Sequence, residues 1–136
     1  MFGALDTSTS ALVAQRVRMD TIMGNIANAE ATRRADGRPG PYRRRVVLFE
    51  AGDGKGGPGV HVRKVVEDPS QGRMRLEPGH PDAIRSGRWQ GYVEYPNVDI
   101  GTEMVNAMLA SRAYEANISA IEVTKGMLSS TLRLLA

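Results

Sequence analysis

Residues 98–136 read VDIGTEMVNAMLASRAYEANISAIEVTKGMLSSTLRLLA, and this stretch decides the fold. Its apolar residues recur in alternating steps of three and four, the spacing of side chains along one face of a helix. The pattern lasts five heptads, with polar residues at two of its positions: Met104, Ala107, Ser111, Tyr114, Ile118, Ile121, Lys125, Leu128, Leu132 and Leu135. It predicts a C-terminal coiled-coil helix over residues 97–136, which Asn97 or Asp99 is suited to cap.

A second helical pattern occupies residues 1–31. Its main apolar residues lie seven apart, with Ile22 and Ala29 on the neighbouring heptad position: Leu5, Leu12, Met19 and Ile26. A hydroxyl side chain between Thr7 and Ser10 is expected to cap this helix. Each terminal segment has one apolar stripe and little else to cover it, so we expect the two helices to pair as an antiparallel coiled coil. Part of the longer helix then stays uncovered, and we expect both ends to be largely disordered in the isolated chain and to become ordered on assembly.

The middle segment, residues 32–96, has a different composition. It contains most of the glycines and all of the prolines, and its short Val-rich runs are typical of strands. Four runs are expected to form a small sheet: residues 42–50, 60–66, 73–77 and 91–95. The glycine-rich residues 51–59 indicate a mobile loop. The predicted fold is therefore α+β, with a small β-rich segment between two long helices.

The residue inventory argues against an enzyme. There is no cysteine, and His61 and His80 are the only histidines. A metal or catalytic site needs three or four converging ligands, which these two residues do not supply. The carboxylates Asp68, Asp82 and Glu94 have no spacing that pairs them for acid–base work, and turn capping explains the first two better. We therefore predict no catalytic residue, no metal and no cofactor.

Six arginines gather within residues 33–45 of a chain whose formal charge is +3. Such a cluster can bind nucleic acid phosphates. However, Tyr42 is the one aromatic residue among them, and no nucleic-acid-binding motif surrounds the cluster. A solvated linker that meets an acidic neighbour is the favoured interpretation. No apolar run is long enough to predict insertion in a membrane, and no cleavable signal peptide is expected.

Two separated motifs carry a family resemblance. Residues 10–20, SALVAQRVRMD, are followed by NIANA at residues 25–29, and near the other end EMV at residues 103–105 precedes SRAYEAN at residues 111–117. In this order the motifs resemble the terminal signatures of the flagellar rod, hook and hook-associated axial proteins. Residues 40–44, 67–70, 78–83 and 91–98 look like the proximal rod members of that family. Gly24 and Glu30 stand where the family usually has Asn.

The resemblance implies a structural subunit of the bacterial flagellar basal-body rod. Such subunits assemble helically into a hollow drive shaft that crosses the periplasm, transmits torque and passes exported subunits. The implied partners are copies of the chain, proximal and distal rod subunits, the MS-ring adaptor and the flagellar type III export apparatus, which exports subunits without a cleaved signal. The motif positions expected to make contacts are Gln15, Arg18, Asn25, Asn28, Arg112, Glu115 and Asn117.

Several alternatives stay open at this level. Asn25 and Asn28 either cap the chain locally or bind the backbone of a neighbouring subunit. Lys125 either extends its charge to solvent or sets the register against a neighbour. For the whole chain, the alternatives are a coiled-coil adaptor that does not polymerise and a nucleic-acid-binding protein.

Overall fold

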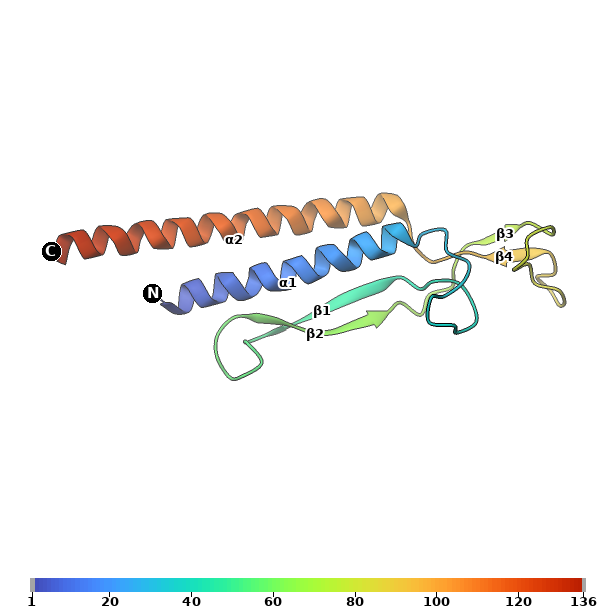
Figure 1. Cartoon of the computed structure of the whole chain (residues 1–136), viewed down its shortest axis with the longest axis horizontal. Coiled ribbons are helices and arrows are strands. Elements are labelled where there is room, and N and C mark those ends of the chain that lie inside the picture. Colours follow the sequence, from blue (N-terminus) through green and yellow to red (C-terminus); the bar gives the residue numbers. More distant parts are fainter. Residues whose placement is uncertain (1, 136) are drawn as a thin grey trace.

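A computed structural model describes residues 2–135 of the chain, and Figure 1 shows its elongated form. The elements in order are α1 (Phe2–Ala27), β1 (Arg45–Ala51), β2 (Val60–Glu67), β3 (Met74–Leu76), β4 (Tyr92–Glu94) and α2 (Ile100–Leu135). The α+β fold with long terminal helices is confirmed. The two helices run antiparallel side by side, the β1–β2 hairpin lies along α1 on the side away from α2, and β3 and β4 lie at the far end (Figure 1).

The two helices begin differently from one another. Asp99 caps α2, because its carboxylate accepts a hydrogen bond of 2.9 Å from the backbone N–H of Thr102. The expected cap of α1 is wrong, since α1 already begins at Phe2 and the Thr7–Ser10 segment lies inside it. There, the Thr7 and Ser10 hydroxyls donate to backbone carbonyls of the preceding turn.

The face of α2 that contacts α1 is turned by one residue from the apolar stripe read in the sequence. Ala107, Tyr114, Ile121 and Leu128 are partly buried, as the stripe predicts. Between them, however, Glu103 and Ala110 are buried, whereas Met104 is 55% exposed. The small Ala110, with the buried Ala14 on α1, lets the helices approach closely, and larger side chains at the contact would hold them apart.

The strands form two separate two-stranded sheets, which corrects the expectation of one small sheet. The hairpin β1–β2 is antiparallel with Arg45 opposite Glu67, and a bulge lies between Leu48 and Phe49. The hairpin is attached to α1 close to the loop between its two strands, because the Ser10 hydroxyl accepts a hydrogen bond of 3.1 Å from the Val60 N–H. Within the connecting loop, the Asp53 carboxylate accepts hydrogen bonds from the N–H groups of Lys55 and Gly57. The mobility of this loop stays a prediction.

The short sheet β3–β4 and its loops form a module at the end of the molecule opposite the chain termini. Its core contains Val93, and the buried Tyr95, Pro96 and Val98 connect the module to α2. Gly72 is required here, because a Cβ at this position would overlap the carbonyl oxygen of Tyr95. The module therefore has a fixed attachment to the helix pair.

Candidate assembly surface and the polar hub that supports it

Asn25 is the centre of a buried polar cluster, which we call the hub and define as Asn25, Tyr42, Arg44 and Glu103. Its side chain is 0% exposed. The Nδ2 group donates to the carbonyl of Arg45 and to Glu103 Oε2, both at 2.9 Å. The Oδ1 atom accepts from the Tyr42 hydroxyl and from the Arg45 N–H, also at 2.9 Å. All four hydrogen-bonding positions of the amide are therefore used within the chain.

Glu103 brings α2 into the hub although it is a carboxylate that is 1% exposed. Its Oε1 accepts a hydrogen bond of 2.8 Å from Arg44 Nε, and its Oε2 accepts from Asn25. A buried carboxylate is tolerated only when it is paired and hydrogen-bonded, and this one is both. Because Arg44 precedes β1, the hub joins α1, α2 and the start of the hairpin at one point.

Asn97 fastens the neighbouring segments beside the hub. Its Oδ1 accepts a hydrogen bond of 2.8 Å from the Arg44 N–H. Its Nδ2 donates to the carbonyls of Asp68 and Ser70, the segment that leaves β2. Of the two residues expected to cap α2, Asp99 therefore caps the helix and Asn97 connects three segments.

The arginine cluster meets its acidic neighbours inside the same chain. The ion pairs join Arg33 to Asp82 at 2.7 Å, Arg34 to Glu67 at 3.1 Å, Arg38 to Asp36 and Glu67, Arg43 to Glu94 at 3.0 Å, and Arg44 to Glu103 at 2.8 Å. Arg45 lies over the ring of Tyr42. Hydrogen bonds from Arg34 lower the pKa of Glu67, and those from Arg33 and Thr32 lower the pKa of Asp82. Residues 33–44 form a largely exposed segment without helix or strand, and five of the six charges in the cluster have carboxylate partners within the chain.

The acidic and histidine residues weighed in the sequence have structural roles. Asp68 caps a turn as expected, by accepting a hydrogen bond from the Ser70 N–H. Asp82 does not: it accepts from Thr32 and Arg33, about 50 residues away in the chain, and ties two loops together. His61 contacts the Gly52 carbonyl and His80 the Asp82 N–H. Within residues 2–135, no group of three or more acidic or histidine side chains is arranged to hold a metal ion.

The candidate functional surface is the part of α2 that α1 does not cover. Since Asn25 bonds to Glu103 in an antiparallel pair, Phe2, which is 23 residues earlier, lies level with position 126. The turns beyond it have no partner helix (Figure 1). A shallow groove of about 460 Å³ lies there, lined by Lys125, Leu128, Ser129, Leu132 and Arg133. Large apolar side chains are exposed along this helix: Met104, Val105, Met108, Leu109, Ile118, Val123, Met127, Leu132, Leu134 and Leu135.

The predicted stripe residues divide between this surface and the helix contact. On α1, Ile22 is buried and the others are partly buried: Leu5, Leu12, Met19 and Ile26. On α2, four predicted residues are exposed: Met104, Ile118, Leu132 and Leu135. Of the other four, Ala107, Tyr114 and Ile121 are partly buried along the helix pair, and Leu128 lines the groove in the turns beyond it.

Most motif residues make local contacts. Asn28 donates to the Gly24 carbonyl at 2.8 Å, Asn117 donates to the Ala113 carbonyl at 2.8 Å, and Arg112 pairs with Glu115 at 3.1 Å. Arg18 is partly buried beside a hollow between α1 and β1. Gln15 Oε1 is buried and has no hydrogen-bond partner among residues 2–135. Asn25 is the exception, because its contacts are long-range and within the chain.

Sequence reasoning missed Arg44, Glu103, Tyr42 and Asn97 as a connected set. The one available signal was Glu103, a carboxylate in the first turn of α2 directly beside the apolar stripe. Its partners are 59 and 78 residues away in the chain, and no local pattern pairs residues over such separations.

Comparisons with known proteins agree on one family. The family model described as "Flagella basal body rod protein" matches residues 5–35, and "Flagellar basal body rod FlgEFG protein C-terminal" matches residues 90–134. The flagellar basal-body rod protein FlgC of Borreliella burgdorferi is 39% identical over 99% of this chain and 97% of its own length. The FlgC proteins of Bacillus subtilis and Salmonella typhimurium are each 40% identical over 98% of this chain and 97% of their own length. The chain therefore belongs to the FlgC family of flagellar basal-body rod proteins.

Proposed function

We propose that this chain is a structural subunit of the proximal rod in the bacterial flagellar basal body and that it catalyses no reaction. In this role it assembles helically into the hollow shaft that transmits torque and passes exported subunits. Its membership of the FlgC family supports the assignment.

The observation that carries the proposal is the uncovered apolar face of α2. Burying a leucine or methionine side chain is worth roughly 1.5–3 kcal/mol, so a row of exposed ones favours association strongly. Contiguous apolar surface of this kind marks an interaction site in a soluble protein. Met104, Ile118, Leu132 and Leu135 are then assembly contacts, and the partly buried stripe residues are the seam of the helix pair.

The partners and location follow from the same role. We assign copies of this chain, other proximal and distal rod subunits and the MS-ring adaptor as neighbours, in a rod that crosses the periplasm. Export occurs through the flagellar type III apparatus without a cleaved signal. In the assembly, residues 1–31 and 97–136 form the coiled-coil layer and residues 32–96 form the outer segment. Among the described helices, none is apolar enough over a sufficient length to traverse a lipid bilayer.

The test replaces Leu132 and Leu135 with Asp in the full chain, in a flagellated bacterium that lacks its own copy of the gene. Both side chains are exposed in the isolated chain, so its fold is expected to persist. We expect loss of swimming and of isolated rods. The matched control is Ser130 and Thr131 replaced with Asp, which adds the same charge near the same end of α2 without removing apolar surface or changing a residue that lines the groove. Normal rods from the leucine variant would refute the proposal, and a purified chain that stays monomeric at high concentration, with an intact helix signal, would favour the adaptor instead.

A further inference from the structure

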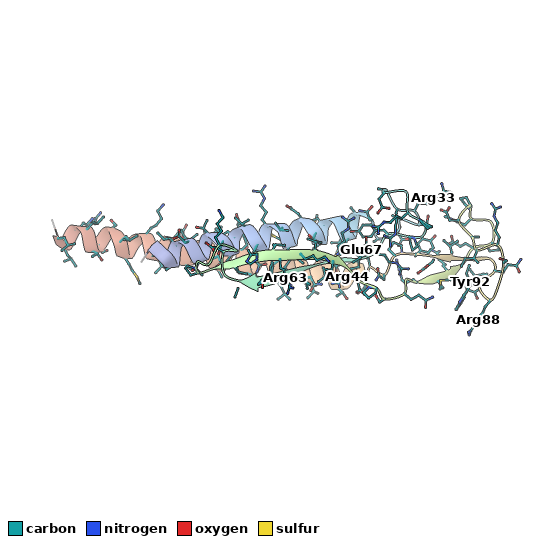
Figure 2. All side chains as sticks on the ribbon, turned by 90° about the horizontal axis from the view of Figure 1, so that it is seen from below. Arg33, Arg44, Arg63, Glu67, Arg88 and Tyr92 are labelled. Atoms are coloured by element: carbon teal, nitrogen blue, oxygen red, sulfur yellow. The ribbon has the colours of Figure 1, made fainter. Side chains whose placement is uncertain are left out.

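A second exposed patch lies at the opposite end of the molecule from α2's free turns. We call it the tip patch and define it as Leu76, Arg85, Arg88, Trp89 and Tyr92. Leu76 is 60% exposed and Trp89 is 39% exposed. Figure 2 shows Arg88 and Tyr92 at this extremity, far from the C-terminal turns of α2. The patch therefore serves a different contact from the one that α2 makes.

The tip patch is one continuous surface. Leu76 and Tyr92 are paired directly across β3 and β4. The Tyr92 ring meets Trp89 edge to face, with ring centroids 5.2 Å apart, and the Arg88 guanidinium lies 5.7 Å from the centre of the Trp89 ring. Beside Leu76, Gly91 leads into a hollow of about 390 Å³ that Arg85 borders. Tryptophan, tyrosine and arginine are the residue types enriched among those that contribute most of the binding energy in protein–protein interfaces.

The loops that carry the patch are held in place before any partner binds. The Ile84 N–H donates to the Tyr92 carbonyl and the Gly91 N–H donates to the Ile84 carbonyl, each at 2.9 Å. The Glu77 N–H donates to the Gly91 carbonyl at the same distance. Binding to such a surface costs little ordering entropy, which favours affinity.

The charges of the patch indicate what it binds. Nine of the chain's 15 arginines are in ion pairs with its own carboxylates, and the other six, which include Arg85 and Arg88, pair with no carboxylate of residues 2–135. Arg85 and Arg88 are both exposed; Arg88 lies over the Trp89 ring and Arg85 borders the neighbouring hollow. A partner that places carboxylates next to an apolar side chain would complement them.

A second copy of this chain is poorly suited to be that partner. Ten of its 15 acidic residues are already in ion pairs within the chain. Asp53 accepts hydrogen bonds from the Lys55 and Gly57 N–H groups, and Asp99 accepts one from the Thr102 N–H. The remaining three, Asp6, Asp20 and Glu122, lie on α1 and α2, the helices whose outer surface self-assembly uses. With a formal charge of +3, copies also repel one another overall.

We infer that the tip patch docks a different protein, one whose surface presents an apolar side chain flanked by carboxylates. Leu76, Trp89 and Tyr92 supply the apolar contact. Arg85 and Arg88 supply the charge that selects this partner over basic or neutral surfaces. This contact goes beyond the rod-subunit role and rests on different residues, so the two are tested separately.

The experiment places the photoreactive residue benzoyl-phenylalanine at Leu76 of the full chain, in the bacterium that makes it, and identifies crosslinked segments by mass spectrometry. The control site is Leu48 of β1, an apolar strand residue that is 43% exposed. We expect the Leu76 probe to attach to another protein at a segment with at least two carboxylates. Arg85→Glu with Arg88→Glu should reduce this product on the order of tenfold or more, because opposed like charges are costly in an interface. Arg85→Lys with Arg88→Lys should retain most of it.

In the Arg85→Glu, Arg88→Glu variant, changing the carboxylates of the crosslinked partner to Lys should bring the crosslinked product back. The acidic residues then lie on the tip patch and the basic ones on the partner, so the charges attract again. Crosslinks from Leu76 to copies of this chain alone would overturn the inference, as would crosslinks to nucleic acid or lipid alone. Equal loss of product at Leu48 and Leu76 in the Glu variant would overturn it too, because a general unfolding would then explain the result. Replacing Leu132 and Leu135 with Asp does not change the tip patch, so the Leu76 probe should still give its crosslinked product with the soluble partner. Failure of the rod role and failure of the tip contact therefore give different results.

Discussion

Replacing Asn25 with Ala removes the centre of the hub and is the most informative single change to the fold. Three of its four hydrogen bonds reach partly buried partners, the Tyr42 hydroxyl and the Arg45 N–H and C=O, and the fourth reaches the buried Glu103 carboxylate. The first three are worth about 0.5–1.5 kcal/mol each, and the bond to a charged group is worth about 1.5–3 kcal/mol. The expected loss in free energy of unfolding is therefore about 3–7.5 kcal/mol.

This loss is large compared with the roughly 0.5–3 kcal/mol of an ordinary substitution, and it is comparable with the whole stability of a small domain. We expect the helix pair and the hairpin to weaken together, because both are tied to the same amide. The assay is urea unfolding of the full chain followed by circular dichroism, in a fixed concentration of trimethylamine N-oxide so that weakened variants still fold.

The matched control is Asn28→Ala, three residues further along. Its side chain makes one local hydrogen bond, to the Gly24 carbonyl, so its removal should cost about 0.5–1.5 kcal/mol. If Asn25→Ala costs no more than Asn28→Ala, the hub does not hold the fold together and the reasoning is wrong.

Three further predictions address other parts of the molecule. Hydrogen bonds lower the pKa of Glu67 and Asp82 in the folded chain, so their contribution is present above the unfolded carboxyl pKa of about 4 and is lost as pH falls through the lower folded pKa. An acid titration followed by amide NMR should show the segment around residues 32–38 loosening only below about pH 4, and loosening near neutral pH would contradict this. Gly72→Ala should displace the β3–β4 module and change Trp89 fluorescence while the helix signal persists, whereas an unchanged emission spectrum would count against the close packing on Tyr95. Hydrogen exchange of the isolated chain should be fast beyond position 126 and slow in β1, and equal protection of the two would remove the case for ordering on assembly.

The long elements were predictable because they depend on local periodicity. A repeated apolar spacing specifies a helix face without reference to the rest of the chain: steps of three and four located α2, and residues seven apart located α1. The Val-rich runs located β1 and β2 to within three residues, because strands also have a local pattern. These local patterns do not show which other element each helix or strand packs against. The four runs were therefore expected in one sheet, whereas the structure divides them into two.

The orientation of α2 about its own axis was also not predictable from a local pattern. Hydropathy alone places Met104 at the contact and Glu103 outside it. In the folded chain, Asn25 and Arg44 satisfy the Glu103 carboxylate, so burying it is no longer prohibitive, and Ala110 gives the closer approach of the helices. The apolar residues that this rotation releases, Met104 among them, become outer surface. A long-range polar contact thus determines which apolar residues are left for assembly.

The exposed face of α2 and the tip patch carry different charges, so different forces favour binding at each. Glu103 is buried in the hub, so the exposed surface of α2 carries three basic residues, Arg112, Lys125 and Arg133, and two acidic ones, Glu115 and Glu122. Its net charge is therefore only +1, and this surface attracts mainly through apolar burial. The tip patch has unpaired arginines instead. Because salt screens charge but not apolar contact, self-association of the purified chain should change little between 50 and 500 mM salt, while tip crosslinking should weaken clearly. Sedimentation at the two salt concentrations measures the first; if association through α2 disappeared at high salt, charge and not the leucine-rich face would be its cause, and the assembly role assigned to Leu132 and Leu135 would have to be abandoned.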